Sequence, residues 1–159
     1  TGGMRQLRSS IAAIATVMFA AGCGGGETAH DGIGVILKVV DGDTVDIRIN
    51  GREERVRLIG IDTPETKKPD TPTECYGPEA STHTVDLLPV DTRVRIERDI
   101  VGRDDYGRLL GYLYRVDDEL FVNYEILRQG YARPLTIEPN STHAVTFAAA
   151  ARLAGDHAR

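Results

Sequence analysis

Hydrophobic and polar residues alternate along the first part of the folded region, where three strands are predicted. β-rich runs cover residues 34–40 (GVILKVV), 44–50 (TVDIRIN) and 53–61 (EERVRLIGI), and the alternation is clearest in the second run. A period of two with many β-branched residues is typical of strands that bury one face. Asn50 and Gly51 form a strong short-range signal for a hairpin turn, so the second and third strands should pair directly. These stretches therefore predict a three-stranded meander.

The pattern then changes to a helix followed by two further strands. Residues 77–89 (GPEASTHTVDLLP) carry a proline and an acid near the start and a proline at the end, which favours a short helix. β-rich runs follow at residues 92–100 (TRVRIERDI) and 107–116 (GRLLGYLYRV). They predict a fourth and a fifth strand.

Two more helices are predicted near the C-terminus. One begins near Val122 and ends at Gly130, a residue type that often follows the last helical turn. The other has an alanine-rich body of high helix propensity, with Asn140 or Ser141 as its N-cap. Five short strands with one helix after the third and two after the fifth predict an all-β barrel with helices (α+β). This is a five-stranded OB-fold barrel with three α-helices.

The N-terminal region has the pattern of an export signal. Two arginines precede an apolar run at residues 11–21, and small residues follow up to Cys23. The run is shorter than the roughly 20 residues that span a bilayer, so we expect a secretory signal peptide that is cleaved. The AAGC sequence resembles the lipobox of bacterial lipoproteins, in which the cysteine is lipidated. Ordinary signal cleavage nearby is the alternative.

Three segments are therefore predicted along the chain. Residues 1–22 contain upstream residues and the signal peptide, residues 23–34 the lipidated N-terminus and a flexible glycine-rich tether, and residues 35–159 the folded domain. We expect an exported, extracytoplasmic protein, anchored to a membrane as a lipoprotein or otherwise secreted. With Cys23 lipidated, Cys75 is left alone, which indicates a missing partner or a free thiol.

Length and charge narrow the possible functions. The 159 residues suffice for one domain of ordinary size with its own core. The chain carries 19 Lys and Arg against 24 Asp and Glu, a formal net charge of −5, and signal cleavage would remove two arginines and no acid. This composition excludes a protein that coats nucleic acid through general basicity. Any phosphate binding must depend on local arginines and a metal ion.

Two acidic clusters lie at strand ends that the predicted hairpin brings together. Asp43 lies in the turn before the second strand (VVDGDTVDI), and Asp62 ends the third (RLIGIDTPE). Hard cations such as Ca²⁺ take carboxylate and carbonyl oxygens, and Pro64 favours an extended Thr63 that can present its carbonyl. The pattern predicts a divalent-cation site. Each motif alone is more often an ordinary turn.

Three other side chains are candidates for catalysis. Glu65 lies two residues beyond Thr63, where it could reach a water molecule near the ion and act as a general base. Arg57 and Arg108 carry guanidinium forks that match phosphate oxygens. An arginine on a strand is more often a solvated surface residue, so neither arginine alone indicates a phosphate site.

Together, six motifs closely resemble those of the staphylococcal nuclease (thermonuclease) family. They occur in the family's order and spacing from about Val35 to the C-terminus: DGDTV, RLIGIDTPE, CYGPEAS, DDYGR, VNYEILRQGYA and PNSTH. The resemblance implies an OB-fold barrel with three helices that hydrolyses DNA and RNA phosphodiesters with Ca²⁺ and leaves 3′-phosphates. We expect the domain to act as a monomer.

The resemblance also implies roles for individual residues. The metal ligands of the family are matched by two carboxylates and a peptide carbonyl: Asp43, Asp62 and Thr63. The pair that holds the scissile phosphate and the residue that activates or positions the attacking water are matched by Arg57, Arg108 and Glu65. Tyr106 matches the tyrosine beside the nucleotide phosphate.

The chain departs from the family pattern near the expected nucleotide. Residues 133–140 (RPLTIEPN) contain no tyrosine where the staphylococcal enzyme has aromatic residues flanking the base, and Asp105 replaces a lysine. Base stacking contributes roughly 1–3 kcal/mol per base, so we expect weaker substrate binding rather than altered chemistry.

Residues and resemblance together predict a Ca²⁺-dependent, sugar-nonspecific nuclease. The leading alternative is a noncatalytic OB-fold module that binds nucleic acid or another ligand. A calcium-binding structural domain would explain the carboxylates but leave both arginines without a role.

Overall fold

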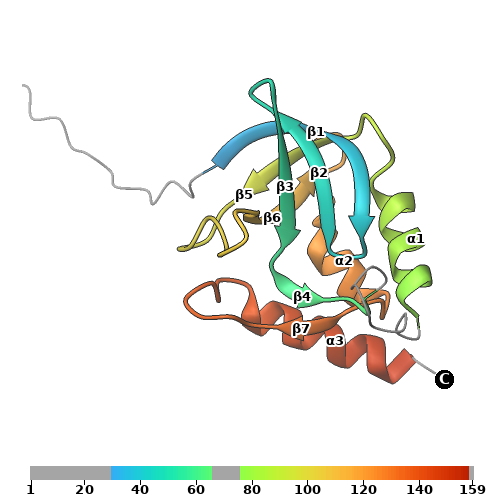
Figure 1. The fold of residues 1–159 in the computed structure, drawn as a ribbon. Helices are drawn as coiled ribbons and strands as arrows, with labels where there is room; N and C mark the ends of the chain where they lie inside the picture. Colours follow the sequence, from blue (N-terminus) through green and yellow to red (C-terminus); the bar gives the residue numbers. More distant parts are fainter. Residues whose placement is uncertain (1–29, 66–75, 158–159) are drawn as a thin grey trace, which may run out of the picture.

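The computed structural model describes residues 30–65 and 76–157, in which it contains seven strands and three helices (Figure 1). The predicted signal peptide, Cys23 and Cys75 lie outside these residues. Within the described ranges, no helix is long and apolar enough to cross a membrane. The first strand begins at His30, so the last five residues of the predicted tether belong to this strand.

Five strands close into a barrel, which confirms the predicted five-stranded OB-fold architecture with three helices. Neighbouring strands in the barrel are antiparallel except β3 and β6, which are parallel. Their order around the barrel is β1 (His30–Asp41), β2 (Thr44–Ile49), β3 (Arg52–Leu58), β6 (Leu109–Arg115) and β5 (Arg93–Glu97). Pairing of β1 with β5 closes the barrel.

The predicted hairpin between β2 and β3 is confirmed. Asn50 and Gly51 both have positive φ, 51° and 75°, as a two-residue turn that follows the strand twist requires. The register pairs Ile49 with Arg52 at the turn and Thr44 with Arg57 at the other end. The hairpin therefore carries Arg57 to the β1–β2 turn.

The third predicted strand is interrupted, contrary to the prediction of one strand over residues 53–61. β3 ends at Leu58, and β4 (Gly60–Asp62) pairs instead with β7 (Arg133–Leu135), which the sequence did not predict. Gly60 has φ of 79°, and a Cβ at this position would lie 2.3 Å from the Phe147 ring. Glycine therefore permits both the turn and the close approach of the last helix.

The three helices cover one side of the barrel and the small β4–β7 sheet. They are α1 (Gly77–Leu87), α2 (Val122–Arg128) and α3 (Ala144–His157). α1 lies beside β1, and α3 packs along β4, β7 and α2 (Figure 1). The predicted N-cap of α3 is wrong because the helix begins at Ala144. Asn140 instead accepts a hydrogen bond from the Val101 N–H at 2.7 Å and donates one to the Val101 carbonyl at 2.9 Å.

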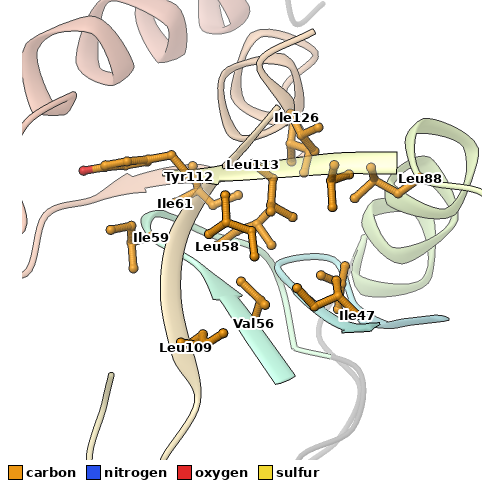
Figure 2. Close-up of a cluster of buried hydrophobic side chains, with 14 of the residues drawn as sticks. Ile47, Val56, Leu58, Ile59, Ile61, Leu88, Leu109, Tyr112, Leu113 and Ile126 are labelled. Carbon is orange, nitrogen blue, oxygen red and sulfur yellow. The ribbon is translucent and has the colours of Figure 1, made fainter. Parts of the chain in front are cut away.

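One hydrophobic core fills the barrel and continues under the helices. Alternate residues of β2 and β3 point inward, and Figure 2 shows Ile47, Val56 and Leu58 converging with Leu113 of β6. Ile126 of α2 joins the same cluster. Since the interior is apolar, charged side chains gather on the outer face and at the strand ends.

Candidate active site

One hollow at the end of the barrel gathers the predicted site residues. Its volume is about 450 Å³, and we call it the charged hollow because most of its lining side chains are acidic or basic. Six predicted metal ligands and catalytic groups line it: Asp43, Arg57, Asp62, Thr63, Glu65 and Arg108. They come from the β1–β2 turn, from β3, from the end of β4 and the segment after it, and from the residue before β6. The structure thus brings them together, while their chemical roles remain predictions.

Arg57 lies between the two carboxylates proposed to hold a cation. Its Nη1 is 3.1 Å from Asp43 Oδ2, and its Nη2 is 3.6 Å from Asp62 Oδ1. Nη1 also donates a hydrogen bond to the Leu58 carbonyl at 2.7 Å. Only 16% of the side chain is exposed, so the guanidinium has a fixed position beside the acids.

Asp43 is a buried carboxylate that several hydrogen bonds hold in place. It is 8% exposed, and its Oδ2 accepts hydrogen bonds from both the backbone N–H and the hydroxyl of Thr63. The Thr44 hydroxyl donates to Oδ1 at 3.0 Å, and the Asp43 carbonyl accepts from the Leu58 N–H. Backbone and side chain together fix the carboxylate with respect to β2, β3 and the segment after β4.

The charged hollow offers oxygen ligands that fit a hard cation. Asp43 and Asp62 approach the same guanidinium, so their carboxylates are neighbours, and the Thr63 carbonyl belongs to the residue bonded to Asp43. Among the described residues, no three Asp, Glu, His or Cys side chains form a metal-binding group. Two carboxylates and one carbonyl therefore fit an ion that keeps several water ligands, not one in a closed cage.

Arg108 is oriented by a carboxylate on its own loop. Its Nε donates to Asp104 Oδ2 at 2.7 Å, and its backbone N–H donates to Oδ1 at 2.9 Å. Burial alone would raise the pKa of Asp104, but these hydrogen bonds outweigh burial and lower it. Asp104 therefore stays charged and holds the Arg108 side chain at the rim of the hollow.

Tyr106 lies next to the charged hollow but does not line it. The tyrosine is 87% exposed, and its ring centroid is 5.5 Å from the Arg108 guanidinium carbon. It borders a second hollow of about 350 Å³, which we call the apolar hollow. Arg57 and Arg108 line both hollows, while Leu135 and Ile137 line only the apolar one. The segment that lacks the expected tyrosines thus supplies aliphatic side chains here.

Three charged residues of the hollow, Arg133, Asp41 and Arg55, were missed by sequence reasoning. Arg133 comes from β7, a strand of three residues with no clear sequence signal, and its Nη2 is 3.6 Å from Asp62 Oδ2. Asp41 belongs to the same VVDGDTVDI cluster as Asp43, and its Oδ1 accepts hydrogen bonds from the Gly42 N–H and from Ser81 on α1. Asp46, from the same acidic cluster, bonds Arg55 instead.

Comparison with known proteins gives consistent matches. The staphylococcal nuclease homologue family model matches residues 55–158. A thermonuclease of Staphylococcus intermedius is 44% identical over 111 residues, which cover 70% of this chain and 64% of that protein. A thermonuclease of Staphylococcus hyicus is 41% identical over 105 residues, covering 66% and 60%. Endonuclease YncB of Bacillus subtilis is 38% identical over 112 residues, covering 69% and 52%. The chain spans less than two thirds of the length of each relative.

Proposed function

The chain belongs to the staphylococcal nuclease homologue family, and on this premise we propose that it is a metal-dependent nuclease that hydrolyses phosphodiester bonds. The observation that carries the proposal is the convergence of two carboxylates, a glutamate and two arginines from separate segments in one hollow. We further propose Ca²⁺ as the metal, both DNA and RNA as substrates, and products with 3′-phosphates.

The two arginines are suited to hold the scissile phosphate. Arg57 on β3 and Arg108 in the loop before β6 border the charged hollow, and each is oriented by a protein oxygen. Guanidinium groups bind phosphate oxygens through paired hydrogen bonds, and fixed donors favour the extra negative charge of the transition state. Glu65 lines the same hollow and is suited to take a proton from the attacking water.

Asp43, Asp62 and the Thr63 carbonyl would hold the metal ion. Bound Ca²⁺ would neutralise negative charge on the phosphate and draw it toward the hollow. Arg57 touches both carboxylates, so it would share them with the ion and keep them in place. Glu65 is not one of these proposed ligands, in agreement with its proposed role as the base.

A DNA zymogram with Ca²⁺ and with a chelator tests the proposal. We expect cleavage only with Ca²⁺, parallel cleavage of RNA, and 3′-phosphate ends in the products. A protein that binds oligonucleotides but cleaves neither substrate would favour the noncatalytic OB-fold module.

We also propose that the protein is exported and anchored through a lipid on Cys23. The support is the apolar run followed by small residues before this cysteine and by glycines after it. Fractionation of cells that express wild type or Cys23→Ser tests the anchor. Wild type should be found with membranes and the variant should not; identical soluble behaviour would leave simple secretion.

A further inference from the structure

Arg133 is placed at the charged hollow by the short β4–β7 ladder. The ladder pairs Asp62 directly with Arg133 and Gly60 with Leu135. Arg133 Nη2 lies 3.6 Å from Asp62 Oδ2, while Arg57 Nη2 lies 3.6 Å from Oδ1 of the same carboxylate. Two guanidiniums from different strands therefore flank one carboxylate.

Arg133 is held more loosely than the other arginines of the charged hollow. Arg55 makes two hydrogen bonds with Asp46, Arg57 bonds the Leu58 carbonyl, and Arg108 bonds Asp104. The contact of Arg133 with Asp62 is longer than a hydrogen bond, and 79% of its side chain is exposed. A surface ion pair of this kind contributes little to stability, so stability does not explain its position.

The two hollows differ in whether their lining side chains can attract a second phosphate next to a bound phosphodiester. Arg133 and Leu135 are two positions apart on β7; the first lines the charged hollow and the second the apolar one. Aliphatic side chains do not attract a phosphate, whereas an exposed guanidinium does. A polynucleotide carries a phosphate on every nucleotide, so a neighbouring phosphate is available at the rim.

We propose that Arg133 binds the phosphate of the polynucleotide adjacent to the one held by Arg57 and Arg108. This rests on the proposed function and adds a further phosphate contact to it. The contact reads charge and not base identity, so it favours chains over single phosphodiesters whatever their sequence.

The test compares a thymidine decanucleotide with thymidylyl-thymidine, whose single phosphodiester has no neighbour. For Arg133→Gln we expect the Kd and KM of the decanucleotide to rise about three- to tenfold, as for loss of one charge-assisted contact. The KM of the dinucleotide should change much less. The slope of the logarithm of the decanucleotide binding constant against the logarithm of the salt concentration should become shallower by about 0.7. This is the change expected when one fewer counterion is released from a single strand. Arg133→Lys should keep the slope.

Arg93→Gln is the matched control. Arg93 is also exposed, approaches Asp117 at 3.9 Å, and does not line the charged hollow. An equal effect of this variant, an unchanged decanucleotide Kd in Arg133→Gln, or equal effects on both substrates would overturn the inference. Wild type that binds the decanucleotide without cleaving it would contradict the proposed nuclease, while the Kd values would still test Arg133.

Discussion

Thr63 donates two hydrogen bonds to a single carboxylate oxygen of Asp43. The backbone N–H and the hydroxyl both lie 3.0 Å from Oδ2, and both residues are buried. The contact joins the β1–β2 turn to the segment after β4. It thereby holds one proposed metal carboxylate against the residue whose carbonyl is proposed as another ligand, so the geometry of the proposed cation site depends on this contact.

Gly42→Ala should disturb this contact. A Cβ on Gly42 would lie 2.7 Å from the Thr63 hydroxyl oxygen and 2.9 Å from its Cβ, and Thr63 cannot rotate away without losing a bond to Asp43. We expect a loss of about 1–3 kcal/mol in the free energy of unfolding, typical of overpacking, together with weaker Ca²⁺ binding. Denaturant unfolding and calorimetry measure both. Gly155→Ala, where the added methyl meets open space on α3, is the control, and equal effects of the two variants would contradict the steric explanation.

Asp43→Asn should abolish most Ca²⁺ binding. The amide keeps the size and one acceptor oxygen for Thr63, but it removes the charge of a proposed ligand. We expect a loss in affinity beyond the 10- to 100-fold typical of residues that only orient ligands, on the order of 100-fold or more. Calorimetric titration measures it, with Asp117→Asn, an exposed carboxylate, as the control. Unchanged affinity in Asp43→Asn would place the ion elsewhere.

Replacing either proposed phosphate-binding arginine with lysine should keep the positive charge but remove the two parallel N–H donors of the guanidinium. For Arg57→Lys and Arg108→Lys we expect kcat to fall by about 10²–10³-fold, the usual effect of losing one oriented donor to the transition state. Binding of the oligonucleotide should fall much less. Arg57→Lys should also lower the free energy of unfolding, because Arg57 bonds the Leu58 carbonyl and contacts two carboxylates. Near-native turnover in both variants would mean that these arginines contribute only their positive charge and not paired hydrogen bonds to the phosphate.

The features of the fold that were predicted correctly are those with a local signal in the sequence. Alternation set the inward faces of β2 and β3, and the Asn50-Gly51 turn fixed their register. That register alone brings Arg57 beside Thr44, next to Asp43. This part of the charged hollow was predictable because Asp43 and Arg57 lie at the same end of one hairpin.

The missed features depend on tertiary contacts. Gly60 is a residue type that can interrupt a strand, but the sequence does not show that the Phe147 ring of α3 packs against it. The same break frees β4 to pair with β7, so Arg133 could not be placed from the sequence. Asn140 is a residue type that often caps helices. Its side-chain amide instead hydrogen-bonds the backbone N–H and carbonyl of Val101, so it is not the cap of α3.

Asp99 should link stability to pH. It accepts hydrogen bonds from the Tyr112 hydroxyl at 2.8 Å and from the Thr142 N–H and hydroxyl, which attach the start of α3 to the barrel. Burial alone would raise the pKa of Asp99, but these bonds outweigh it and lower the pKa. Because the pKa of Asp99 is lower in the folded state, its charged form stabilises the protein at pH values above its ordinary pKa of 3.8. This contribution is lost as the pH falls through the pKa of the folded state.

The measurement is the free energy of unfolding of wild type and Asp99→Asn between neutral and strongly acidic pH. We expect the variant to be less stable by about 1–3 kcal/mol at pH 7, because charged acceptors form the stronger hydrogen bonds. The difference should shrink below pH 4. A difference that stays constant with pH would mean that the charge of Asp99 does not matter.

Glu65→Gln separates catalysis from binding at one side chain. Glutamine keeps the size and most of the hydrogen bonding of Glu65, but it cannot take a proton. If Glu65 activates the attacking water, turnover should fall by about 10²–10⁴-fold, the usual contribution of a positioned base. Affinity for Ca²⁺ and for the oligonucleotide should change little, since the ion is proposed to rest on Asp43, Asp62 and the Thr63 carbonyl.

Initial cleavage rates at saturating Ca²⁺, beside anisotropy with the same oligonucleotide, measure the two effects of Glu65→Gln independently. Glu53→Gln removes an exposed carboxylate from β3 and controls for the change in charge, because Glu53 does not line the charged hollow. A large loss of Ca²⁺ affinity in Glu65→Gln would make Glu65 a ligand of the ion instead of a base. Cleavage within a few-fold of wild type would keep the nuclease but require another group to accept the proton, and the other acid at the hollow with no proposed metal role is Asp41.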